Sequence, residues 1–165
     1  MHQSTSQRQR DKRTILIALL LLLLSACSAT PYHQQKKGVL VADFYADKVG
    51  TVLVLVEKSA EARPVAVIEI TPMDNFRVLE LSAGEYTWSE LREPGRVTPL
   101  SGHFDINVQA DTINYIGSIL IKSYQTGPQI SVVNQTTEVR QRLQTDYPAI
   151  AQRFPFMLNL THQHQ

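Results

Sequence analysis

The stretch Thr51-Val52-Leu53-Val54-Leu55-Val56-Glu57 places five consecutive apolar side chains between two polar ones. Successive side chains of a β-strand point to opposite faces of the sheet, so a run without polar alternation is apolar on both faces. Branched residues dominate the run and favour an extended backbone. The segment therefore predicts a central strand that other parts of the protein cover on each face.

Short apolar or alternating segments continue on both sides of this strand. Turn-forming residues separate them about every 8 to 12 positions, which is the spacing of an all-β sandwich. Strands do not alternate with helices and no glycine-rich phosphate loop is present, which argues against a nucleotide-binding fold. We expect a mainly β protein, an antiparallel β-sandwich of about seven to eight strands with a C-terminal helical segment. The other expected strands are Val39 to Tyr45, Val65 to Ile70, Phe76 to Leu81, Glu85 to Leu91, His103 to Val108, Thr112 to Lys122 and Gln129 to Asn134.

Two hairpins can be placed from their turn residues. Ser82-Ala83-Gly84 and Gln109-Ala110-Asp111 each separate two expected strands, and Gly84 is free to adopt positive φ. The segment from Leu81 to Trp88, LSAGEYTW, resembles the Pro/Ala-Gly-x-Tyr hairpin of transthyretin-like and carboxypeptidase-regulatory-like β-sandwiches. This resemblance implies a binding, spacing or structural module that is not a catalyst, and it transfers no site residue.

The apolar residues change to a helical period after residue 134. Asn134 or Thr136 can cap a helix that carries Val139 and Leu143 on one face. Pro148 suits the first turn of a second short helix. We expect both helices to pack over an open edge or end of the sheet. The side chains expected to be buried there are Leu143, Tyr147, Ile150 and Phe154.

The first 26 residues have the pattern of an export signal. Four basic residues precede Ile15 to Leu24, an unbroken run of ten apolar side chains. A helix needs about 20 apolar residues to cross the hydrocarbon core, so this run is too short to span a membrane. Residues 1–26 are therefore expected to be removed as a signal peptide.

The end of the apolar run, Leu24-Ser25-Ala26-Cys27, resembles a bacterial lipobox. The resemblance implies cleavage between Ala26 and Cys27 and attachment of fatty acyl chains such as palmitate to Cys27. Each buried CH₂ adds about 0.8 kcal/mol of membrane affinity, so several chains anchor a protein firmly. Ser28, in place of Asp, implies the periplasmic face of the outer membrane, with an inner-membrane lipid anchor as the alternative.

These patterns divide the chain into four parts. After the signal peptide, residues 27–37 are the lipidated cysteine and a polar, extended tether. Residues 38–158 are the β-sandwich domain with its C-terminal helices. Residues 159–165 are expected to be a mobile tail.

The charge balance bears on the class of partner. The whole chain has 16 Lys and Arg against 15 Asp and Glu, and removal of residues 1–26 leaves 12 against 14. Proteins that neutralise several phosphates carry a basic surplus, so nucleic acid is not an expected partner. The membrane, held through the lipid on Cys27, and an envelope protein are the expected partners.

Few residues suggest catalysis or metal binding. His103 and Asp105 share a strand face, as a metal pair or an acid–base pair requires, but no third ligand accompanies them. Ser101 lies close by without the Gly-x-Ser-x-Gly frame of a nucleophile elbow. His162 and His164 can chelate a transition metal only weakly. The single cysteine excludes a disulfide framework and a zinc site of several thiolates.

Acidic residues raise one further possibility, a carboxylate pair for glycan hydrolysis. Such a pair works only at a fixed separation inside a cleft. Acidic residues that alternate with apolar ones are the ordinary outer face of a sheet, and that is where we expect these. The residues in question are Asp43, Asp47, Glu80, Glu85 and Glu90.

Three aromatic residues are candidates for a partner or ligand surface. Tyr86 and Trp88 share a strand face, and with Tyr115 they can form an aromatic platform for a peptide or a glycan. The competing interpretation is core packing, which we favour for Trp88 because a Trp on a sandwich strand commonly fills the space between the sheets.

Taken together, the patterns favour an interaction or structural module over an enzyme. We expect a lipid-anchored periplasmic protein of the bacterial cell envelope with no catalytic residue, no metal and no cofactor. The alternative is an envelope hydrolase or a lipoprotein that binds a small glycan or peptide.

Overall fold

The computed structural model describes residues 36–59, 63–71, 73, 75–100 and 104–163. The signal peptide, Cys27 and the tether up to residue 35 lie outside these residues. The described residues belong to one compact unit, Gln35–Gln165. Their elements are β1 (Lys37–Ala46), β2 (Thr51–Glu57), β3 (Pro64–Ile70), β4 (Arg77–Ser82), β5 (Gly84–Glu93), β6 (Arg96–Pro99), β7 (Phe104–Val108), β8 (Ile113–Tyr124), β9 (Gly127–Val133), α2 (Thr136–Asp146), α3 (Pro148–Arg153), β10 (Phe156–Leu158) and β11 (His162–Gln163).

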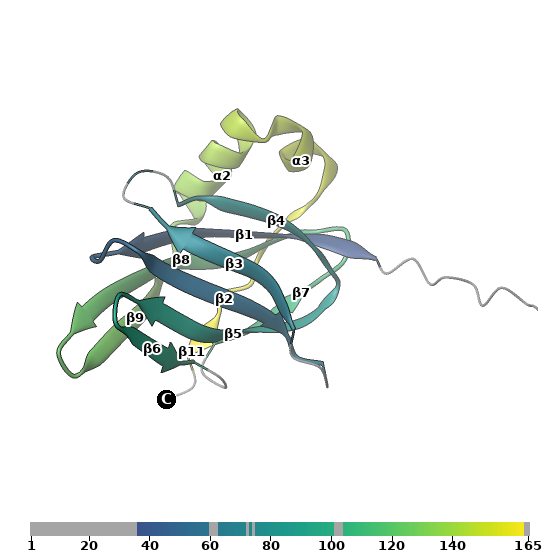
Figure 1. Cartoon of the computed structure of the whole chain (residues 1–165). Helices are drawn as coiled ribbons and strands as arrows, with labels where there is room; N and C mark the ends of the chain where they lie inside the picture. Colours follow the sequence, from purple (N-terminus) through teal and green to yellow (C-terminus); the bar gives the residue numbers. More distant parts are fainter. Residues whose placement is uncertain (1–35, 60–62, 72, 74, 101–103, 164–165) are drawn as a thin grey trace, which may run out of the picture. The chain divides into compact units, whose positions relative to one another are not determined.

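The strands form two sheets, which confirms the predicted β-sandwich (Figure 1). Sheet A has five strands in the order β10-β8-β1-β4, with β9 also paired to β8. Sheet B has six strands in the order β11-β7-β5-β2-β3, with β6 also paired to β5. Among the described residues, no helix is long and apolar enough to cross a membrane.

The predicted antiparallel pairing holds throughout sheet B, whereas sheet A is mixed. The long central strands β1 and β8 run parallel, from Val39 opposite Ile113 to Ala46 opposite Ile121. The short strand β10 also runs parallel to β8. Parallel neighbours need a long connection, and more than 60 residues separate β1 from β8, so no local hairpin signal marks this pairing.

The main core fills the space between the two sheets. The predicted central strand is confirmed, because β2 lies between β3 and β5. Leu53 and Leu55 point into the core, and the alternate residues Val54 and Val56 are buried as well. Trp88 packs edge-on against the ring of Phe44, with the ring centroids 5.6 Å apart.

A bulge in β8 decides which of its residues face the helices. Val41 lies opposite Tyr115 but Asp43 lies opposite Ser118, so β8 contains one extra residue at this point. Gly117 occupies the bulge with a φ of +103°, and a Cβ there would lie 2.3 Å from Cγ1 of Val132. The bulge reverses the alternation of side chains along β8. Ile113 and Tyr115, before the bulge, therefore face the helices, whereas Ile119 and Ile121, after it, face the core between the sheets.

The two helices cover the outer face of sheet A and form a third layer (Figure 1). The sequence led us to expect the helices over an open edge or end of the sheet, and this expectation is wrong. Val139 and Leu143 of α2 are buried in a second core, with Val39, Val41, Phe76, Ile113 and Tyr115 of the sheet side. This coverage is needed because that face of sheet A is itself apolar.

The second helix is docked less deeply than predicted. Leu143 is buried as expected, but Ile150 and Phe154 are only half-buried. Tyr147 is exposed, so its predicted burial is wrong. Tyr147 lies at the junction of α2 and α3, where its ring is tilted by 38° to that of Phe76 with the centroids 6.0 Å apart.

The C-terminal residues belong to the domain as far as Gln163, which corrects the expected tail at 159–165. Asn159 N–H donates to the carbonyl of Tyr115, and Thr161 N–H donates to that of Ile116. Thr161 is buried, and β11 then pairs with β7. At the other end the domain also begins one residue early, because Lys37 opens β1 and forms a 3.0 Å ion pair with Glu80.

Replacing Leu143 with Ala should lower the free energy of unfolding by about 2 to 5 kcal/mol, because it removes buried apolar atoms and leaves a cavity. Chemical denaturation measures this difference. The matched control is Gln141→Ala on the exposed side of the same helix, which should change stability by no more than about 0.5 kcal/mol. Equal stabilities of the two variants would show that α2 is not anchored through Leu143.

Candidate functional site

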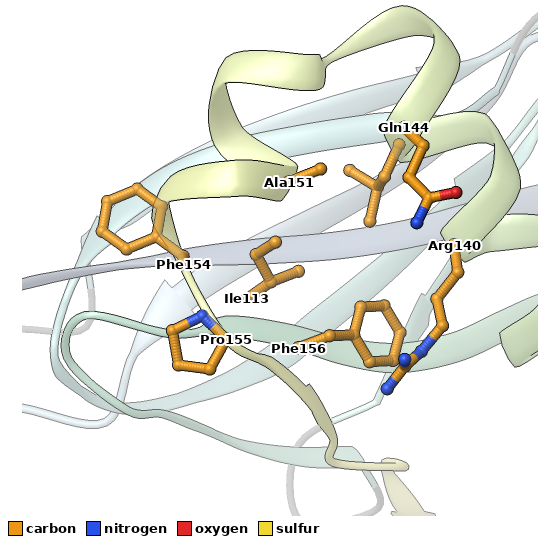
Figure 2. Close-up of a pocket in the computed structure, with 8 residues that line it drawn as sticks. Ile113, Arg140, Gln144, Ala151, Phe154, Pro155 and Phe156 are labelled. Atoms are coloured by element: carbon orange, nitrogen blue, oxygen red, sulfur yellow. The ribbon is translucent and has the colours of Figure 1, made fainter.

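A pocket of about 220 Å³ opens between the helical layer and sheet A (Figure 2). It is the best candidate for a binding site because it combines a buried apolar floor with polar groups at its rim. Its lining residues are Ile113, Arg140, Leu143, Gln144, Ala151, Phe154, Pro155 and Phe156.

Local structure brings these residues together from three elements. Arg140, Leu143 and Gln144 lie three and four positions apart on α2, so they share one helix face. Ile113 reaches the pocket because it precedes the bulge in β8. Its N–H donates to the carbonyl of Pro155 at 2.8 Å, which fixes the chain between α3 and β10 along the sheet.

The floor of the pocket is fully apolar. Ile113 and Leu143 are each about 1% exposed, and both belong to the second core. Ala151 and the rings of Phe154 and Phe156 are half-buried and form the walls. A floor of this kind binds an apolar group by removing it from water.

The rim carries a guanidinium and a carboxamide. The guanidinium of Arg140 lies over the ring of Phe156, with its central carbon 4.3 Å from the ring centroid. Arg140 has no ion pair with any residue that the structure describes, whereas Arg142 two positions later pairs with Asp146 at 3.3 Å. In Figure 2 the side chains of Arg140 and Gln144 project from α2 on the same side of the pocket.

Tyr115 supports this wall from beneath. Its ring centroid lies 5.9 Å from that of Phe156. Its hydroxyl accepts a 3.0 Å hydrogen bond from the N–H of Gln135 and lies 3.2 Å from Oγ of Ser118. Tyr115 therefore holds Phe156, and through it Arg140, against the sheet.

The three aromatic candidates do not form an exposed surface. Tyr86, Trp88 and Tyr115 are each at most 2% exposed. Tyr86 and Trp88 lie in the core between the sheets, as favoured for Trp88, while Tyr115 lies in the second core on the opposite face of sheet A. Tyr86 donates its hydroxyl to the carbonyl of Ser82, and burial raises the pKa of Tyr86. Sheet A lies between Tyr115 and the other two rings, so the three rings do not form one platform.

A second pocket, also of about 220 Å³, lies on sheet B and contains the sequence candidate Asp105. Nζ of Lys58 lies 2.8 Å from Oδ2 of Asp105, and this hydrogen bond raises the pKa of Lys58. Glu85 lines the same pocket. The charge that faces Asp105 in this pocket is therefore the ammonium group of Lys58. Ser101, His103 and His164 lie outside the described residues, as does the side chain of His162.

The other acidic candidates lie apart and have separate partners. Asp43 accepts hydrogen bonds from the N–H of Phe44 and the hydroxyl of Tyr45, whereas Asp47 accepts them from Ser123. The remaining candidates form ion pairs on the surfaces of different sheets: Glu80 pairs with Lys37 on sheet A and Glu90 with Arg92 on sheet B. Within the described part of the chain, no two of these four carboxylates share a hydrogen-bond or ion-pair partner.

Glu93 is a buried carboxylate that no pattern in the sequence distinguishes. Its side chain is 1% exposed, and Oε1 contacts the hydroxyl of Ser123 and lies 3.9 Å from Nζ of Lys48. Oε2 makes no hydrogen bond within the described part of the chain. Since the same hydroxyl also contacts Asp47, this cluster ties together the turns that end β1, β5 and β8.

The rim residues of the first pocket were also missed from the sequence. Arg140 and Gln144 are four residues apart on an expected helix, and that spacing was the available signal. Phe156 gave none, because β10 has only three residues and follows a proline. Within the described ranges, no three His, Cys, Asp or Glu side chains come close enough together to hold a metal ion.

Comparison of the chain with protein-family models, curated proteins and solved structures found no match.

The backbone N–H and the hydroxyl of Ser123 hold the pKa of Asp47 below its usual range. The resulting contribution to stability is present above the unfolded-state pKa of about 3.9 and is lost as the pH falls through the lower folded-state value. Ser123→Ala keeps the backbone donor and removes the hydroxyl, so the pKa of Asp47 should rise only part of the way to normal.

An NMR titration of the Asp47 carboxyl carbon measures this change. Ser131→Ala, an exposed serine on β9, is the control and should leave the titration unchanged. A normal Asp47 titration in the unmodified protein would contradict the assignment.

Proposed function

We propose that the protein is a lipid-anchored interaction module of the bacterial cell envelope, and that its partner places an apolar side chain in the pocket beneath α2 and α3. The carrying observation is the pocket itself: a floor of Ile113 and Leu143 that opens beside the accessible side chains of Arg140 and Gln144. Apolar lining with a few polar groups is the usual composition of a binding site.

The size of the pocket favours a protein partner. Sites for drug-sized molecules commonly start at about 300 Å³, and this pocket has about 220 Å³. A single large side chain fits such a volume, and one anchoring side chain in a pocket is a common arrangement at protein interfaces. The rest of the interface would lie on the surrounding helices.

The lipobox resemblance supplies the anchor. The nine residues from Ser28 to Lys36, which precede β1, would reach at most about 32 Å if extended, so they would keep the domain near the bilayer. Val39 at the start of β1 pairs with Ile113 in the pocket floor. The pocket therefore lies at the end of sheet A where the chain leaves the proposed tether, within reach of other envelope proteins.

Replacing Cys27 with Ala should abolish incorporation of labelled fatty acid and leave an uncleaved precursor, because Cys27 is the only thiol in the chain. Metabolic labelling and the mobility of the protein on a gel measure both effects. Ser25→Thr, which changes the lipobox without touching the thiol, is the control and should remain labelled. Equal labelling of the unmodified protein and Cys27→Ala would refute the anchor.

Cross-linking tests the pocket. A photoreactive residue at Gln152, exposed on α3 beside Ala151, should give one defined cross-linked product in intact cells, to be identified by mass spectrometry. Ala151→Phe fills the pocket and should abolish the product. Ala149→Phe adds the same ring at an exposed position of the same helix and should leave the product in place.

A product that survives Ala151→Phe, or one that forms only from a photoreactive residue at exposed Val97 on sheet B, would show that the pocket is not the binding site.

A further inference from the structure

We propose that the pocket binds the free C-terminal residue of a polypeptide. The last side chain, an apolar one, would occupy the pocket, the α-carboxylate would bind Arg140, and the last peptide group would bind Gln144. This inference rests on the proposed function and specifies the chemistry of the partner. The evidence for it is the positive charge and the hydrogen-bonding groups at the rim, which binding of an apolar side chain alone would not require.

Arg140 is the positive group of the site. Its side chain is exposed, and no carboxylate among the described residues neutralises it. Its guanidinium packs by one face on the ring of Phe156, which leaves the N–H groups at its edge able to donate. Two parallel N–H donors match the two oxygens of a carboxylate, so a guanidinium held in this way is suited to an anionic chain end.

The neighbouring arginine provides the contrast. Arg142 lies on the same helix, but its guanidinium packs on Phe76 and pairs with Asp146. Arg142 does not line the pocket. Of these two arginines, only Arg140 lines the apolar pocket, and only its charge is not balanced by a described carboxylate.

Gln144 follows Arg140 by one helical turn and lines the same pocket. Its carboxamide makes no hydrogen bond to another described residue, and it offers both a donor and an acceptor. A peptide group presents the complementary pair, a carbonyl and an N–H. A free fatty acid would use Arg140 and the apolar floor but would leave Gln144 without a matching group, so the rim favours a polypeptide.

The geometry of the pocket agrees with one terminal residue. In Figure 2, Arg140 and Gln144 stand together at one side, while Ala151, Phe154 and Pro155 lie further across the pocket. A ligand held at the polar side can therefore direct an apolar side chain between α3 and the sheet. Capture of a C-terminal carboxylate is a recurring mode of peptide recognition.

Isothermal titration calorimetry of the full chain in detergent micelles tests the proposal. The probes are acetyl-Gly-Gly-Leu with a free carboxylate, the same peptide as its C-terminal amide, and octanoate. The free acid should bind about tenfold more tightly than the amide, since the charge-assisted contact to Arg140 is lost in the amide. Octanoate should bind more weakly than the peptide acid.

Two variants make the test specific. Arg140→Met keeps an apolar stem over Phe156 and should remove the preference for the acid, so that acid and amide bind equally. Arg142→Met removes the same charge two residues away and should keep the preference. Thermal denaturation checks that both variants remain folded.

Each other outcome has a distinct meaning. Equal binding of acid and amide, or a preference that survives Arg140→Met, overturns the carboxylate proposal. Tighter binding of octanoate also overturns it and identifies an acyl chain as the ligand. If no probe binds while the pocket-dependent cross-link persists, the C-terminal proposal fails and the proposed function stands; if both are absent, both fail.

Discussion

The fold depends on covering a β-sheet that is apolar on both faces. Val39, Val41, Ile113 and Tyr115 face away from the main core, yet none is more than 3% exposed. Burying a large apolar side chain contributes about 1.5 to 3 kcal/mol, so this outer face favours a covering third layer. Helices of eleven and six residues are marginal alone in water, so α2 and α3 owe their structure to the sheet that they cover.

The pocket is a consequence of incomplete coverage. α2 contributes two buried side chains, but α3 contributes none, so the helical layer is tightly packed at one helix and open beside the other. The chain from Phe154 to Phe156 closes part of this opening, fixed by the hydrogen bond from Ile113 to Pro155. The rest of the opening is the pocket, whose walls of Ala151, Phe154 and Phe156 are only half-buried by the domain. Such a surface is available to a partner.

The sequence predicts the elements of this fold better than it predicts their arrangement. The apolar run from 52 to 56 correctly identifies a central strand, and the spacing of Val139 and Leu143 correctly identifies a buried helix face. The parallel pairing of β1 with β8 brings together segments that are distant in the chain, and no local pattern encodes it. The same limit applies to the site, because its floor joins Ile113 of β8 to Leu143 of α2, two elements that are distant in the chain. In the sequence, nothing distinguishes Arg140 from other exposed arginines on helices. Only the structure shows that its guanidinium lies over Phe156 and forms no ion pair with a described carboxylate.

The helix α3, which lines the pocket through Ala151, has fewer buried side chains than α2. α3 has no side-chain cap and no buried residue, and elements of this kind open locally at low free-energy cost. A ligand that fills the space beside Ala151 and Phe154 would add apolar contacts to this helix and stabilise its docked position. Under the proposed function, partner binding and firm docking of α3 are therefore one coupled event. The rim would set which partner binds, and the packing of the second core would keep Ile113 and Leu143 in place.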